Sequence, residues 1–483
     1  MDPLLFFTIA AIIIPIIFSL LVFNSRRAYN LSVVASLISF LCVLCITYLF
    51  LFSYGTISHK YEVIYYRGIE LGFIIDTLSV LISFMVAFNG LATIVFSKYY
   101  MSPLNKEHPI KFEKTIRFYS FLLIFESSAL GFIYSSTLLS MIIFFELTSI
   151  CSFFLIGYYG TPESRKASFE ALIVTHIAAM GLYVAAGITY AYTGSLNVVA
   201  IKSLPELMKT VTLLCLLVAA MGKSAQVPTH TWLPHAMVAP TPVSAYLHAA
   251  AMVKLGVYLM LRVYIEVGFT QIVTIACLVV GLISMMYGCI MYFPQRDLKR
   301  LLAYSTITQL SYILTGVGIA SLGSSLALQG AALHIFNHGF AKELFFLTAG
   351  LISYSTGTRL LNEISGLKKI KGAAVGFIVA AMSITGIPPF NCFWSKISII
   401  IGGYQTGTLV GIIASTIILF ESLICFIWFL RILTQCIMGK PSERVEKAQE
   451  VPSSMKLVIY SLVLFTLISP IIAGPFLRLL INP

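Results

Sequence analysis

Twelve ionisable residues lie within stretches of the sequence that are otherwise apolar enough to be embedded in lipid. A charged side chain at the centre of a bilayer costs about 2.5–3.5 kcal/mol even on a mild insertion scale, so such residues usually face a polar interior and serve a function. Acids and bases at this depth predict the movement of an ion across the membrane. The residues are Lys223, Lys254, Lys342, Lys396, Arg431, Glu126, Glu146, Glu343, Glu421, His248, His334 and His338.

Three of these residues repeat at four-residue spacing in one apolar stretch. His334, His338 and Lys342 would lie on one face of a helix, about 6 Å apart along its axis. A single histidine in this place would more simply make a polar contact between helices. Three ionisable groups in register favour a short, water-linked path for protons.

Lys223 and Glu146 each need a partner of opposite charge if they are buried in lipid. A carboxylate that approaches a buried lysine and then withdraws changes how tightly the lysine holds its proton. The two residues could therefore form a switchable proton store. The alternative is a static ion pair that ties two helices together.

His248 and Lys254 share one predicted span but lie about 120° apart around it, so we expect them to face different neighbours. His248 could pass protons between Lys223 and the row of histidines and lysine. Lys254 could either extend its ammonium toward the membrane interface or pair with Glu126. Arg431 is expected to anchor the end of its helix at the membrane interface.

The composition, 59% hydrophobic and only 10% charged, predicts an all-α polytopic membrane protein. Apolar runs of about twenty residues, long enough to cross the hydrocarbon layer, alternate with polar breaks. We predict about fourteen transmembrane spans: 4–23, 30–53, 72–97, 117–135, 137–158, 168–191, 210–227, 240–262, 270–292, 301–321, 325–353, 373–401, 407–435 and 455–480.

Basic residues alternate between the predicted loops in a way that orients the chain. With the first residue outside the cell, 20 of the 31 lysines and arginines fall in cytoplasmic loops, so both termini are predicted outside. The net charge of +12 is thereby explained without a nucleic-acid partner. These loop residues include Arg26, Arg27, Lys106, Lys299, Arg359 and Lys447.

Two of the predicted spans contain a break. The segments 221–228 and 386–389 each place prolines and polar residues inside an apolar run, five spans apart. Broken helices in corresponding places predict two inverted five-helix repeats with ion sites near the middle of the membrane. Within one membrane domain, 1–483, the predicted parts are 1–116, a first repeat at 117–262, a second at 270–435, and a last span at 455–480.

The nine cysteines fall in or at the ends of apolar runs and form no CxxC pair or His/Cys cluster. They are predicted to be small core residues. We expect no metal site, no cofactor and no catalytic redox site in this chain, so whether it belongs to an enzyme depends on its partners.

Several stretches of sequence resemble one family. They are GKSAQVPTHTWLPHAMVAPTPVSAYLHAAAMVKLGVYL (222–259), FELTSICSFFLIGYY (145–159), QRDLKRLLAYSTITQLSYI (295–313), HIFNHGFAKELFFLTAG (334–350) and GIPPFNCFWSK (386–396). The chain resembles, over about residues 70–435, the antiporter-like subunits of respiratory complex I, of Mrp sodium/proton antiporters, and of membrane-bound hydrogenases and sulfane reductases.

This resemblance implies roles for individual residues. Glu146 matches the family glutamate that pairs with a lysine of the seventh span, here Lys223. Lys342 matches the central lysine, and Lys396 the residue that exchanges protons with the outer face. The histidines implied to lead to the central lysine are His248, His334 and His338.

The chain also departs from the pattern of complex I. Ala179 stands where the distal subunit of complex I has an aspartate, and His176 where that subunit has an arginine. Glu343 replaces an expected small apolar residue. Additional carboxylates either bind sodium or change the proton affinity of the lysines, and the sequence leaves both open. These additional carboxylates are Glu126 and Glu421.

The resemblance implies a proton-translocating or sodium-translocating subunit of a multi-subunit complex in the plasma membrane of a prokaryotic cell. We expect other integral membrane subunits as partners, together with a hydrogenase-like or iron–sulfur arm that supplies the driving reaction. Two alternatives stay open. One is a subunit of a stand-alone Mrp-type sodium/proton antiporter, and the other is a quinone-binding membrane subunit with a cavity open to lipid.

Overall fold

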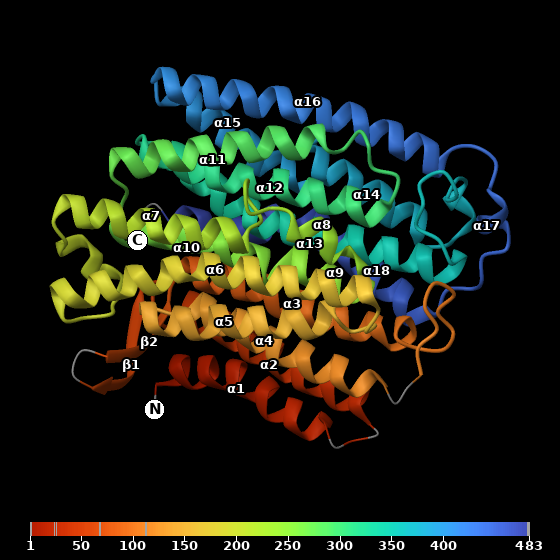
Figure 1. Cartoon of the computed structure of the whole chain (residues 1–483), viewed down its shortest axis with the longest axis horizontal. Helices are drawn as coiled ribbons and strands as arrows, with labels where there is room; N and C mark the ends of the chain where they lie inside the picture. The colour runs from red at the N-terminus through yellow and green to blue at the C-terminus, as the bar shows by residue number, and fades with distance from the viewer. Residues whose placement is uncertain (1, 24, 26, 67–68, 112–113, 481–483) are drawn as a thin grey trace.

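The computed structural model describes residues 2–23, 25, 27–66, 69–111 and 114–480, so the loop residue Arg26 lies outside the described residues. Long helices run side by side through the whole molecule (Figure 1). The main helices are α1 (Pro3–Phe23), α2 (Ala28–Phe52), α3 (Thr77–Tyr100), α4 (Thr115–Tyr134), α5 (Leu138–Ile156), α6 (Pro162–Thr193), α7 (Glu206–Lys223), α10 (Val253–Val267), α11 (Gln271–Ile290), α12 (Leu298–Ser321), α13 (Ser325–Thr356), α14 (Ala373–Thr385), α15 (Asn391–Gln405), α16 (Leu409–Ile437) and α18 (Ser453–Leu479).

The predicted all-α, multi-pass architecture is confirmed. Each of the fourteen predicted spans coincides with one long helix or with a broken pair. Among the described residues, nine helices are individually long and apolar enough to cross a membrane, namely α1 to α6, α11, α16 and α18. The other spans contain the breaks or the buried polar residues, which lowers their hydropathy.

The third span begins later than predicted, because its first residues belong to a hairpin. Strands β1 (His59–Tyr66) and β2 (Ile69–Ile75) pair antiparallel, with His59 opposite Ile75. The side chain of Asp76 then accepts a hydrogen bond from the backbone of Ser79 at 2.9 Å and caps α3. The predicted start at residue 72 was therefore wrong, since the cap fixes the first turn of α3 at Thr77.

Both predicted breaks are present. The helix α7 ends at Lys223, and the chain continues through α8 (Trp232–His235) and the 3₁₀ turn η3 (Ala236–Val238). The second break separates α14 from α15. That the two breaks mark inverted repeats stays a prediction.

The eighth span is less regular than predicted. It comprises α9 (Thr241–Tyr246), a π-helical turn η4 (Leu247–Ala251) and α10. A π turn inserts one residue into the helical repeat and often lies at a functional site. Here it rotates His248 relative to Lys254, the two ionisable residues of this span.

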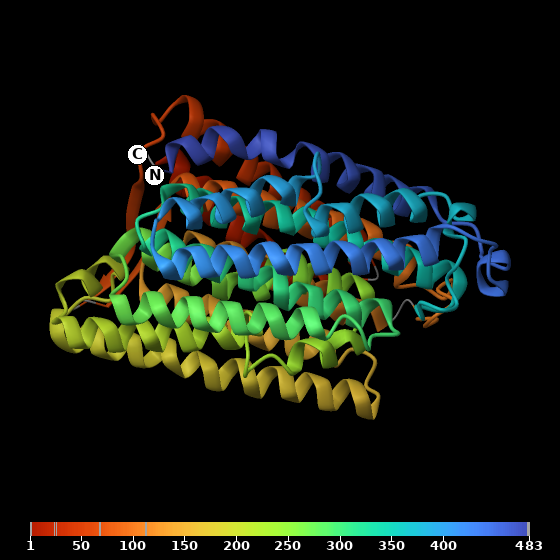
Figure 2. The same ribbon diagram turned by 90° about the horizontal axis from the view of Figure 1, so that it is seen from above.

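The helix α13 runs through the centre of the bundle, and all its residues from Gly330 to Thr356 are buried. It packs against α3, α9, α12, α14, α15 and α18. Seen from above, α6 forms one edge of the bundle and α18 lies at the opposite edge (Figure 2). A polar residue on α13 is therefore shielded from lipid by helices on every side.

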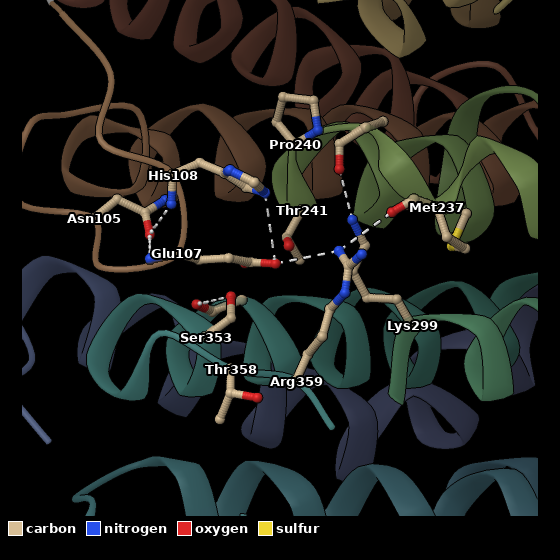
Figure 3. A network of polar contacts seen from close by, with 12 residues as sticks. Asn105, Glu107, His108, Met237, Pro240, Thr241, Lys299, Ser353, Thr358 and Arg359 are labelled. Carbon is tan, nitrogen blue, oxygen red and sulfur yellow. Dashed lines mark hydrogen bonds and ion pairs between the residues drawn. The ribbon is translucent and has the colours of Figure 1, made fainter. Parts of the chain in front are cut away.

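A network of charged side chains joins three connecting segments of the chain (Figure 3). Arg359, which follows α13, pairs with Asp297 at 2.5 Å and with Glu107 at 3.2 Å. Asp297 also caps α12 by accepting a hydrogen bond from the backbone of Arg300 at 3.0 Å. Lys299, predicted as a loop residue, is instead buried and donates to the carbonyl of Ala239 at 2.6 Å.

The ion pair between Glu107 and Arg359 predicts a pH-dependent stability. Burial opposes ionisation of Glu107, but the nearby Arg359 and Lys299 outweigh it and hold the pKa of Glu107 below its ordinary value. A lowered pKa stabilises the fold above the ordinary range near 4.3, and the stabilisation is lost as the pH falls through the folded-state pKa. We expect Glu107→Gln to lower stability at neutral pH by about 1–3 kcal/mol and to weaken the acid dependence.

Thermal unfolding of the purified protein at neutral and acidic pH measures this effect. The matched control is Glu443→Gln, which removes an exposed pair with Lys447 and should change little. Equal behaviour of the two variants would show that the buried pair contributes no more than an exposed one.

Candidate functional site

Four polar side chains of α12 contact the ionisable residues predicted from sequence. These neutral side chains, all buried, are Ser305, Thr306, Gln309 and Tyr312. The spacing places them along one stripe of the helix. The stripe provides hydrogen-bonding partners for groups that would otherwise be buried among apolar side chains.

Lys342 of α13 is held against this stripe. Its ammonium donates to the carbonyl of Leu302 at 3.0 Å and to the hydroxyl of Ser305. One residue further along α12, Thr306 lies 3.1 Å from Nδ1 of His248. Lys342 and His248 therefore contact adjacent residues of α12 and lie close to one another in the core.

Lys254 contacts α13 rather than Glu126. Its ammonium donates to the carbonyl of Ile335 at 2.9 Å and lies 3.0 Å from Nδ1 of His338. The predicted pair of Lys254 with Glu126 is wrong, because Glu126 faces α2 and accepts a hydrogen bond from Ser36 at 2.9 Å. A charged Lys254 requires that Nδ1 of His338 accept the bond, which leaves the proton of a neutral ring on Nε2.

The two histidines of α13 lie one above the other, as their spacing predicts. The rings of His334 and His338 are stacked with centres 5.7 Å apart and planes within 8°. His334 also lies 2.8 Å from the hydroxyl of Ser395 and 3.1 Å from the amide oxygen of Gln309. Both ring nitrogens of His334 thus have polar partners on neighbouring helices.

Tyr312 joins this row to Lys396 and Glu421. Its ring centre lies 5.5 Å from the ring centre of His334, and the Lys396 ammonium lies 4.5 Å from the Tyr312 ring centre. The Tyr312 hydroxyl donates to Glu421. A buried chain of polar contacts therefore runs from Lys254 through both histidines to Lys396 and Glu421, and we call it the polar axis.

The second helix break makes room for Lys396. Gly386, with φ +79°, ends α14 in a left-handed conformation that favours glycine. A Cβ at this position would lie 2.8 Å from Cδ of Lys396. The sequence Gly-Ile-Pro-Pro therefore both ends the helix and lets the lysine side chain pass beside its end.

The other half of the site contains Lys223 and Glu146. The ammonium of Lys223 donates to the carbonyl of Phe145 and to the hydroxyl of Ser149, each at 2.7 Å, and lies 4.4 Å from the centre of the Phe145 ring. Glu146 instead contacts Nδ1 of His176 at 3.0 Å. Among the described residues, Glu146 and Lys223 form no direct ion pair, contrary to the pairing that the resemblance implies.

The contact between His176 and Glu146 was not anticipated. His176 lies in the predicted span 168–191, and was noted only as a departure from complex I. Because His176 is an ionisable residue inside an apolar span, the sequence could have marked it as a candidate site residue. Which carboxylate it meets could not be predicted, since Glu146 is thirty positions earlier and belongs to another helix, α5.

The two halves are not joined directly by side-chain contacts. In the part of the chain that the structure describes, no hydrogen bond joins Lys223 directly to His248. Three residues after Lys223, the amide oxygen of Gln226 accepts a hydrogen bond from Ser311 of α12 at 2.8 Å. Proton transfer between the halves therefore requires water or a rearrangement of these groups.

Outside the polar axis, Arg431 lies 5.0 Å from the ring of Trp428 and is exposed, which suits an interfacial anchor. Within the described ranges, no three histidine, cysteine, aspartate or glutamate side chains lie together as ligands for a metal ion.

The middle of the chain matches a known family model. Residues 135–422 match the model described as "NADH:quinone oxidoreductase/Mrp antiporter, TM". The match covers more than half of the chain. The chain belongs to this family. It is an antiporter-like membrane protein.

Relatives and solved structures agree with this assignment. A protein of Staphylococcus saprophyticus named as an antiporter subunit, mnhA2, is 36% identical over 68% of this chain and 42% of its own length. The mnhA2 of Staphylococcus aureus strain USA300 is 32% identical over 84% of this chain and 53% of its own length. The chain thus spans about half the length of the curated relatives it matches.

Two solved structures share the fold. One is a chain of the Mrp complex from Dietzia sp. DQ12-45-1b, with a TM-score of 0.86 and 26% identity, covering 99% of this chain and 52% of that one. The other is a chain of the membrane-bound sulfane sulfur reductase, an archaeal respiratory membrane complex, with a TM-score of 0.85. At 20% identity over 98% and 96% of the two chains, the second likeness concerns the fold alone.

The contacts of Lys223 predict a selective effect of one hydroxyl. Ser149→Ala removes one of its two hydrogen-bonding partners, and a bond to a charged group is worth about 1.5–3 kcal/mol. We expect proton transport by the purified complex in vesicles to fall about tenfold. Ser152→Ala is the matched control, since Ser152 is equally buried on α5 but bonds only to its own helix. Equal rates for the two variants would contradict a role for this contact.

Proposed function

We propose that the chain is a proton-translocating, antiporter-like subunit of a multi-subunit complex in the plasma membrane of a prokaryotic cell. The polar axis is the observation that carries this proposal. It crosses the core from Lys254 to Glu421, and every ionisable group in it is at most 3% exposed. Buried ionisable groups are too unfavourable to be retained in series without a use.

The chain's own residues would act as follows. Movement of Glu146 between His176 and Lys223 would change the proton affinity of Lys223, because a nearby carboxylate favours the charged lysine. The proton of Lys223 would pass toward His248 and Lys342, which contact adjacent residues of α12, and from there to the polar axis. Lys396, at the end of the axis, would exchange protons with the outer face if both termini lie outside the cell, as the loop charges predict.

Two kinds of complex could drive transport by this chain, and the relatives favour one of them. The two relatives described above, at 36% and 32% identity, are named as antiporter subunits, and one fold neighbour belongs to an Mrp complex. These support a place in an Mrp-type cation/proton antiporter with other membrane subunits. Coupling to a hydrogenase-like or iron–sulfur arm, the expectation from sequence, stays the second candidate, because the sulfane reductase chain shares only the fold.

The quinone-binding alternative is less well supported. It calls for a lipid-facing cavity in place of a polar axis through the core. An apolar cavity of about 270 Å³ does lie between α1, the hairpin and α5, but the described residues that line it include no ionisable group. The polar axis lies elsewhere, around α12 and α13.

Replacement of the central lysine tests the proposal. We expect Lys342→Ala and Lys223→Ala to reduce proton transport in vesicles containing the purified complex to near background, because each removes a proton-carrying group. The control is Lys202→Ala, at an exposed lysine. Unchanged coupled transport in both variants would overturn the proposal. Mass spectrometry of the subunits that co-purify distinguishes the two driving arrangements.

A further inference from the structure

Two buried glutamates lie away from the polar axis and on the flank of α3. Glu343 is next to Lys342 in sequence, but it points from α13 toward α3, where Thr93 donates to it at 2.6 Å. Glu126 of α4 packs against Gly90 of α3 and accepts a hydrogen bond from Ser36 of α2. Both carboxyl groups are fully buried.

The flank of α3 is built to receive these side chains. A Cβ on Gly90 would lie 2.8 Å from Cδ of Glu126, so only glycine leaves the carboxyl group its present place. Asn89, four residues before Thr93, donates to the carbonyl of Gly339, four residues before Glu343. The two helices therefore meet in register along two consecutive turns.

On this flank of α3, the described residues include more buried oxygen acceptors than hydrogen-bond donors that reach them. Three buried oxygens have no hydrogen-bond partner among the residues that the structure describes: Oε2 of Glu126, Oε2 of Glu343 and Oδ1 of Asn89. Among the described residues, no lysine, arginine or histidine lies within ion-pair distance of either glutamate. An ionised carboxylate that is buried and unpaired is strongly unfavourable, whereas a protonated carboxyl group supplies a donor and carries no charge.

We propose that Glu126 and Glu343 form a lateral proton store, in which each carboxyl group holds one exchangeable proton beside α3. The store is separate from the polar axis, since Glu343 faces α3 while Lys342 faces α12. Tyr246 lies within electrostatic range of both carboxyl groups, and its hydroxyl donates to the carbonyl of Val86 on α3 at 3.3 Å.

Tyr246 links the surroundings of the store to the π turn of the eighth span. It is the last residue of α9 and immediately precedes the π turn that contains His248. A local change in this turn would alter the positions of Tyr246 and His248 together. The proposal rests on the proposed function only for the destination of the protons, because the protonation of the two carboxyl groups is measurable without transport.

Infrared spectroscopy of the full chain in its purified, membrane-reconstituted complex tests the store. At neutral pH we expect two carbonyl bands of protonated carboxyl groups, each shifted on transfer from H₂O to D₂O. Glu126→Gln should remove one band and Glu343→Gln the other, while Glu62→Gln, at an exposed position of β1, should remove neither. Gly90→Ala should shift the band of Glu126 alone.

Labelling the wild-type protein with ¹³C-glutamate keeps the test informative if a variant fails to fold, because both bands should then move together. The proposal is overturned if the bands are absent, if they do not exchange in D₂O, or if added sodium removes them at constant pH, which would indicate a cation site. Exchangeable bands in a complex that moves no protons would support the store and count against the proposed transport function.

Discussion

Burial of ionisable groups among helices surrounded by lipid is the constraint on which the structure depends. Each such group needs a polar partner, because the hydrocarbon of the lipid cannot form hydrogen bonds with it. The lysines of this chain meet the need mostly with neutral acceptors. Lys223, Lys254 and Lys342 all donate to backbone carbonyls, and each has a second partner in a serine or a histidine.

Neutral partners have a functional consequence. A lysine held by a strong carboxylate pair would retain its proton, whereas one held by carbonyl and hydroxyl oxygens can lose it and keep much of its surroundings intact. In the proposed function, Glu146 would add or withdraw the missing negative charge, since it lies on α5 next to Phe145, whose carbonyl holds Lys223. In the structure, this carboxylate contacts His176 and not Lys223.

Helix breaks serve the same constraint. The regular α-helix is interrupted at three places: where α7 ends after Lys223, where α14 ends beside Lys396, and at the π turn that contains His248. Irregular backbone inside a membrane is tolerated where protein or a polar cavity surrounds it. Each of these three irregular segments thus lies next to an ionisable residue of the site. The polar stripe of α12 contacts the ionisable residues of the half that contains Lys342 and Lys396.

The sequence by itself determined the class of fold, the fourteen spans, both breaks and most of the buried ionisable residues, because hydropathy and spacing are local properties of the chain. It also placed His334, His338 and Lys342 on one helical face. It did not predict that Lys299 is buried. It could not determine which residues meet across helices. Such contacts depend on how helices far apart in sequence rotate and pack, which only the tertiary structure decided. Examples are the contacts of Lys254 with His338 and of Glu146 with His176, and the position of Glu343 against α3.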